Sequence, residues 1–325
     1  MAVEYTAPLS HAWARMKRIL FSPFDLGKWI VLGFAAFLVD LGDLAEQSGG
    51  GSSNLELEDS DIESIARSAS DLLANGWETV VASTALILLV GAALVLVLAA
   101  WVACQWVSSR GMFMFLDNVV HNRSRIKQPW AEYRAEGNSL FAWRVAFEVI
   151  TLIIGLLFLV DLVAIFLPTI IDKELMPFSV AALVVLAWVG AVLLVVSAYI
   201  GLFLEHFVVP IMYKHRIGVM EAWRRVLALF RARTVELLLY GLFILLLNVI
   251  VVVAGVILGL VTCCVAFLVV AIPYVGSVIL LPISVTFRSL SVAFLAQFGE
   301  DYRIDFEDDA TDEGTIPEPP ILPGT

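Results

Sequence analysis

The sequence has few charged residues. Only 16% of its 325 residues are Asp, Glu, Lys or Arg, whereas 60% are hydrophobic. Soluble domains usually hold about 25% charged and about 45–50% apolar residues. A chain this apolar does not fold as a water-soluble globular domain, so its composition predicts an integral membrane protein.

Cysteine is also scarce. Cys104, Cys263 and Cys264 all lie within apolar runs, and an odd number at lipid depth excludes a disulfide framework. The adjacent pair has no partner His and no second Cys-x-x-Cys to complete a metal or redox site. We therefore interpret all three as small apolar packing residues.

Catalytic motifs are absent. The four histidines are dispersed, and there is no Gly-x-Ser-x-Gly, Walker A or Gly-x-Gly-x-x-Gly. The net charge of −11 comes from acids concentrated in 46–78 and 300–318, and no nucleic-acid-binding module is visible. We expect a non-enzymatic protein with no cofactor, no metal and no nucleic-acid partner.

The sequence contains several long apolar runs. A spanning helix needs about 20 apolar residues. Six runs come near or exceed this length, at 27–44, 79–107, 142–170, 179–208, 235–262 and 275–297. The first is the shortest. Residues 261–270 form either a re-entrant piece or, as we favour, the tilted end of the fifth span. The predicted fold is an all-α membrane bundle of six transmembrane helices within residues 1–299.

The distribution of Lys and Arg predicts the orientation. Segments 1–28, 108–144 and 209–234 hold sixteen of these residues, whereas 45–78 and 171–178 hold two. Because positive loops stay in the cytoplasm, both termini are predicted to be cytoplasmic, in the cytoplasmic membrane of a prokaryote. Segment 45–78 is then an acidic extracytoplasmic loop, and 300–325 reads as an acidic, disordered cytoplasmic tail.

Three cytoplasmic segments each predict a short amphipathic helix with a Trp on one side and bases on the other. Such helices typically lie in the membrane interface and contact anionic lipid. Alternatively, they only pack beneath the bundle. Each precedes two spans, and Phe37–Leu41 repeats as Phe158–Leu162, so a threefold internal repeat is possible. The candidate lipid-interface residues are Trp13, Arg15, Arg18, Trp130, Arg134, Trp223, Arg224 and Arg225.

Polar residues inside the spans are functional candidates by default. Asp40, Asp161 and Asn248 lie at depths that scatter over about 13 Å along their helices, so we do not expect one ring of ligands. Arg288 has two candidate ion-pair partners, Glu148 and Glu205. The candidate intramembrane polar site comprises Glu148, Asp161, Glu205, His206, Asn248 and Arg288.

Several short motifs resemble an uncharacterised family of prokaryotic polytopic membrane proteins. They include Ser22–Trp29, Trp130–Arg134, Ala222–Arg225, Ile272–Ser277 and Gln297–Gly299. The pattern is similar in style to the membrane domain attached to some glycerophosphoryl diester phosphodiesterases. No catalytic phosphodiesterase domain is present here, so the resemblance implies a membrane domain and no activity.

Three functional hypotheses follow. The first is a membrane-organising protein that binds lipid or a protein partner, including a second copy of itself, at the cytoplasmic face. The second is a transporter or channel for a small solute or ion that uses the polar residues between the spans. The third is a membrane enzyme, which requires clustered acids or histidines that face one pocket.

Overall fold

The computed structural model describes residues 4–47, 84–172, 177–262 and 265–306. Most of the acidic loop 45–78 and the tail from residue 307 lie outside these ranges. Every regular element among the described residues is helical, which confirms the all-α prediction there. The elements are α1 (Thr6–Phe21), α2 (Leu26–Gln47), α5 (Thr84–Val120), α6 (Lys127–Glu132), α7 (Arg134–Asp172), α8 (Pro177–Phe203), the π-helix η2 (Leu204–Val208), α9 (Val209–His215), α10 (Val219–Ala232), α11 (Thr234–Val261), α12 (Val265–Val270), α13 (Pro273–Ile279), α14 (Leu281–Leu295) and the 3-10 helix η3 (Ala296–Phe298).

Five stretches are long and apolar enough to cross a membrane, which supports a multi-pass membrane protein. They are Gly91–Val120, Arg134–Ile165, Ala181–His215, Thr234–Val261 and Leu281–Phe298. The first predicted span, α2, is a helix but does not qualify. Any 18-residue stretch of α2 contains three charged residues, above the two that such a span tolerates. The prediction of six spans is therefore not confirmed by length and composition.

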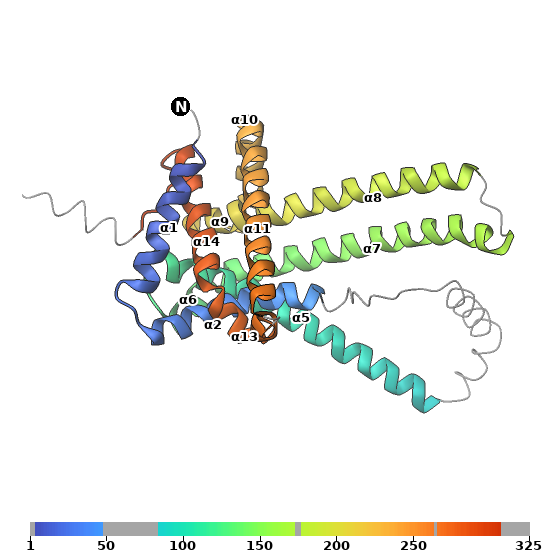
Figure 1. The fold of residues 1–325 in the computed structure, drawn as a ribbon, viewed down its shortest axis with the longest axis horizontal. Coiled ribbons are helices and arrows are strands. Elements are labelled where there is room, and N and C mark those ends of the chain that lie inside the picture. Colours follow the sequence, from blue (N-terminus) through green and yellow to red (C-terminus); the bar gives the residue numbers. More distant parts are fainter. Residues whose placement is uncertain (1–3, 48–83, 173–176, 263–264, 307–325) are drawn as a thin grey trace, which may run out of the picture.

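The structure consists of a packed group of helices, called the base, and three long helical arms that project from it. In the base, α2 packs along the C-terminal half of α5, and α1 packs along α14. The outer parts of α5, α7 and α8 project from it, with α7 and α8 side by side and α5 diverging (Figure 1). The 24 residues of α7 beyond Glu148 extend about 36 Å, enough to cross a hydrocarbon core of about 30 Å. Side chains along these arms are exposed and apolar, as lipid contact requires.

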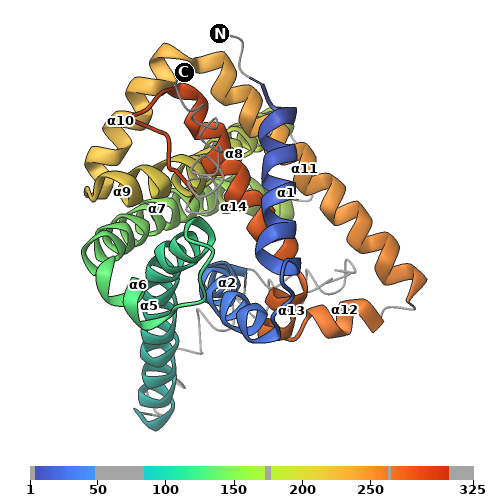
Figure 2. The ribbon, with the colours of Figure 1, turned by 90° about the vertical axis from the view of Figure 1, so that its left-hand side faces the viewer.

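Helices α11 and α14 run in a different direction from α7 and α8. Figure 2 views α7 and α8 nearly end-on, whereas α11 and α14 lie lengthwise across that view. Half of the residues in the apolar stretch Leu281–Phe298 are buried, whereas none are buried in the most apolar 18 residues of α7 or α8. Helix α14 therefore belongs to the core of the base. The six predicted spans thus do not form one parallel bundle in this structure.

The fifth apolar run is broken rather than continuous. We favoured residues 261–270 as the tilted end of one long helix, but α11 ends at Val261 and α12 is a separate short helix. The Thr262 hydroxyl donates to the Leu258 carbonyl at 2.8 Å at the end of α11. A Cβ on Gly259 would lie 2.1 Å from the Phe267 ring, so α12 folds back on α11 where there is no side chain.

Gly111 allows the close crossing of α2 and α5. A Cβ there would lie 2.9 Å from Leu38 Cβ and 3.1 Å from its backbone. We expect Gly111→Val to destabilise the protein by about 1–3 kcal/mol, because neither backbone yields easily. Gly91→Val, on the same helix with nothing within 4 Å, is the matched control and should be neutral. Thermal unfolding of both variants in detergent tests this, and equal midpoints would contradict it.

Candidate functional site

A π-helix, η2, distorts the C-terminal end of α8 just before Pro210. Proline has no N–H, so it cannot donate to a carbonyl one turn earlier. The Val209 N–H bonds to the Leu204 carbonyl, five residues back, as in a π-turn. The Glu205 and His206 carbonyls therefore lack their usual helical donors. Such turns often accompany functional sites.

Helix α14 supplies donors to both carbonyls. Arg288 Nη1 donates to the Glu205 carbonyl at 2.9 Å, and Ser291 Oγ donates to the His206 carbonyl at 2.5 Å. Arg288 Nη2 also donates to Glu205 Oε1 at 3.0 Å. Of the two partners proposed for Arg288 from the sequence, the structure shows Glu205. This buried arginine ties α14 to the π-helix through backbone and side chain together.

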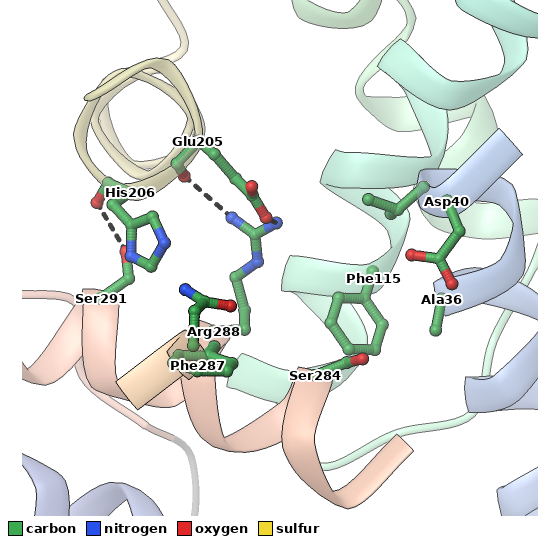
Figure 3. Close-up of a pocket in the computed structure, with 11 residues that line it drawn as sticks. Ala36, Asp40, Phe115, Glu205, His206, Ser284, Phe287, Arg288 and Ser291 are labelled. Atoms are coloured by element: carbon green, nitrogen blue, oxygen red, sulfur yellow. Dashed lines mark hydrogen bonds and ion pairs between the residues drawn. The ribbon is translucent and has the colours of Figure 1, made fainter. Parts of the chain in front are cut away.

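A polar pocket of about 170 Å³ opens beside this ion pair. Asp40 of α2 faces Glu205 and Arg288 across it, with Phe115 and Ser284 between them (Figure 3). The pocket thus joins residues from the first, fourth, fifth and sixth predicted spans with Phe115 of α5, which lies beyond the predicted end of the second span. The full lining is Ala36, Val39, Asp40, Phe115, Glu205, His206, Asn248, Ser284, Phe287, Arg288 and Ser291.

Hydrogen-bond acceptors remain open in this pocket, while most donors are used. Ser277 donates to one oxygen of Asp40 at 2.7 Å, and the Asn248 amide donates to the Ile244 carbonyl at 3.0 Å. Within the described part of the chain, no hydrogen bond reaches the other oxygen of Asp40, Glu205 Oε2 or Asn248 Oδ1.

The lining of the pocket contains more acidic than basic side chains. Two carboxylates, Asp40 and Glu205, face one guanidinium, Arg288. Arg144 also lies within electrostatic reach of Glu205, but it is not in the lining and donates to Ser108 Oγ of α5 at 3.0 Å. With both carboxyl groups ionised, the lining alone carries one net negative charge and favours a cationic hydrogen-bond donor.

The predicted polar site is divided by the structure. Glu205, His206, Asn248 and Arg288 line the pocket, whereas Glu148 and Asp161 do not. Asp161 is exposed on the outer arm of α7. Asp40 and Asn248 share the pocket despite their different depths, because α11 crosses the direction of α2 instead of running parallel to it. Whether these residues act together in function stays a prediction.

Sequence reasoning missed three hydroxyl groups and left Asp40 out of the candidate polar site. Ser284, Arg288 and Ser291 follow an i, i+4, i+7 spacing, which puts them on one face of a helix. That spacing is visible in the sequence. No sequence pattern indicates the contact between Ser277 and Asp40, because the two residues are 237 positions apart.

The candidate lipid-interface residues divide in a similar way. Arg15 is buried and donates to the Val119 and Val120 carbonyls at the end of α5. The Trp130 ring packs against Trp106, and Trp223 packs against Trp143. These contacts favour the packing interpretation for those three residues. The remaining members stay wholly or partly exposed: Trp13, Arg18, Arg134, Arg224 and Arg225.

A second polar cluster, around Asp117, is structural. Its Oδ1 accepts from the Tyr213 hydroxyl at 3.0 Å and from the Tyr133 hydroxyl at 3.4 Å, and His121 Nδ1 lies 3.1 Å away. Burial raises the pKa of Tyr133 to about 12, so its hydroxyl stays protonated as a donor. Among the described residues, no group of three or more His, Cys, Asp or Glu is arranged to hold a metal ion.

Comparison with protein families matches residues 5–299 to a family of unknown function, DUF7544. The chain belongs to this family. The DUF7544 match includes all the pocket-lining residues. Searches of curated proteins and of solved structures found no match. Nothing in these comparisons links DUF7544 to the membrane domain of glycerophosphoryl diester phosphodiesterases. Function is therefore argued from the chemistry of the site.

Proposed function

We propose that this protein is a multi-pass protein of the prokaryotic cytoplasmic membrane whose polar pocket binds a small ligand carrying a protonated amine. The pocket supports this because its lining is negative and its open hydrogen-bond positions accept rather than donate. This is the binding chemistry expected of a solute-binding or transport protein. It favours the second hypothesis from the sequence over lipid organisation at the surface.

The six-span topology remains part of the proposal. Helix α11 has 28 residues, about 42 Å, and the arms of α7 and α8 are also longer than a core of about 30 Å. Helices longer than the bilayer cross it at a tilt. Opposite tilts would let α11 and the α7–α8 pair share one membrane despite their different directions. Each short helix then precedes two spans, as the threefold repeat requires.

Lipid binding at the cytoplasmic face is retained as a second function for one reason. Arg18, Arg134 and Arg224 are exposed on or beside the three short helices, where anionic headgroups would lie. Neutralising Arg224 and Arg225 should weaken binding to vesicles that contain an anionic phospholipid. Unchanged binding would remove this function and leave the pocket unaffected.

The proposed amine site predicts that ethylamine binds the purified protein and that Asp40→Asn weakens binding at least tenfold. Asn keeps the size of the side chain but removes its charge, and a charge-assisted hydrogen bond contributes about 1.5–3 kcal/mol. Isothermal titration calorimetry in detergent measures this. Glu221→Gln on the surface of α10 is the matched control and should bind like wild type. Equal affinity in Asp40→Asn would refute the proposed site.

A further inference from the structure

An apolar groove of about 430 Å³ adjoins the polar pocket. It runs between α1, α11 and α14, and Phe287 lines both cavities. Neighbouring residues also line different cavities. Asn248 lines the pocket and Leu247 lines the groove, and likewise Ser284 lines the pocket and Ile283 lines the groove. Its lining is Thr6, Leu9, Ser10, Trp13, Leu247, Ile250, Val251, Ile283, Thr286 and Phe287.

The two cavities differ sharply in chemistry. The pocket presents the carboxylates of Asp40 and Glu205, whereas no charged residue lines the groove. Ligand sites usually measure about 300–1,000 Å³. The polar pocket alone, at about 170 Å³, is below that range, and the groove lies within it. A ligand that fills both has a small cationic end and a longer apolar end.

We infer that the ligand is a single-chain amphiphile with a protonated amine, its headgroup in the polar pocket and its alkyl chain in the groove. The inference rests on the proposed function, because the same carboxylates hold the amine. The chain passes Phe287 and follows α1 toward Trp13, whose side chain is half exposed at the groove. Trp at a boundary between apolar and polar surroundings is typical of a membrane interface.

The test is a titration of the purified full-length chain with ethylamine, butylamine, hexylamine and octylamine. Each buried CH₂ contributes about 0.8 kcal/mol, or roughly a fourfold gain in affinity. We expect the dissociation constant to fall with every added CH₂, by twofold to fourfold. Octanol, which has the chain without the amine, should bind at least tenfold more weakly than octylamine. Detergent micelles without protein supply the blank.

Two matched variants test whether the chain lies in this groove. Ile250 lines the groove and Leu246 does not, yet their exposed fractions are nearly equal, at 54% and 55%. We expect Ile250→Asn to weaken octylamine binding at least tenfold and to leave ethylamine binding unchanged. Leu246→Asn should change neither.

These measurements distinguish a failure of the groove from a failure of the amine site. If ethylamine binds and longer chains gain nothing, the amphiphile is wrong and the amine site stands. Equal weakening by Ile250→Asn and Leu246→Asn would also overturn the groove. Octanol binding as tightly as octylamine would show that the amine is not recognised in this site. If no amine binds the wild type, the proposed function fails together with this inference.

Discussion

Arg288→Ala is expected to destabilise the protein by about 3 kcal/mol. The change leaves the Glu205 carboxylate without its cation and the Glu205 carbonyl without its donor. In the π-helix the Val209 N–H, the usual helical donor to this carbonyl, donates to the Leu204 carbonyl instead. Because the Glu205 side chain is 46% exposed, water can stabilise part of its charge, which keeps the cost near the low end for a broken buried pair.

Thermal unfolding in detergent should show this loss as a lower midpoint, by roughly 5–10 °C. Arg303→Ala, on the surface after η3, is the control and should unfold like wild type. In the double variant with Glu205→Gln, the loss should be smaller than the sum of the single losses, because no unpaired carboxylate remains. An Arg288→Ala midpoint equal to that of wild type would show that this ion pair does not hold α14 to the π-helix.

The second large effect concerns topology. A cysteine at Ala271, between α12 and α13, is expected to react with a membrane-impermeant maleimide added outside intact cells. Six spans place this turn outside, because α11 leaves the cytoplasmic side after the basic helix α10. The readout is all or none. The three natural cysteines are first replaced by alanine, so that only the introduced thiol reacts.

Two further positions calibrate the labelling. Ser124→Cys, between α5 and α6, should react only after the membrane is opened, because that segment is predicted to be cytoplasmic. Ser52→Cys, in the predicted extracytoplasmic loop, should react in intact cells. If Ala271→Cys behaves like Ser124→Cys, α11 lies along the cytoplasmic face and the protein has four crossing helices instead of six. Four or six crossings both leave the two termini on the same side of the membrane, so the position of the termini does not distinguish the two topologies.

Most of the helices could be predicted from the sequence. Apolar runs are local signals, and α8 and α11 begin and end near the apolar runs 179–208 and 235–262, whereas α7 begins at Arg134, well before the run 142–170. The break after Val261 was harder to place, because it depends on Phe267 folding back against Gly259, a tertiary contact. Helix α14 was expected to be a span. Its burial against α1 follows from packing that no single run of residues displays.

The site was less predictable for a physical reason. Depth along a helix locates a side chain only if the helices are parallel, and α11 is not parallel to α2. The ion pair between Arg288 and Glu205 was one of two candidates because charge alone does not distinguish Glu148 from Glu205. The deciding feature is the Glu205 carbonyl, which the π-turn at Val209 leaves without its helical donor and which gives Arg288 a second bond at Glu205.

The most direct test is an experimental structure determined with octylamine. The proposed site predicts the ammonium nitrogen in the polar pocket, within about 3 Å of a carboxylate oxygen of Asp40 or Glu205, a distance typical of charge-assisted hydrogen bonds. The alkyl chain should run past Phe287 between α1 and α14. Octylamine bound elsewhere, or Asp40 and Glu205 turned away from a common pocket, would contradict a polar site built for an amine.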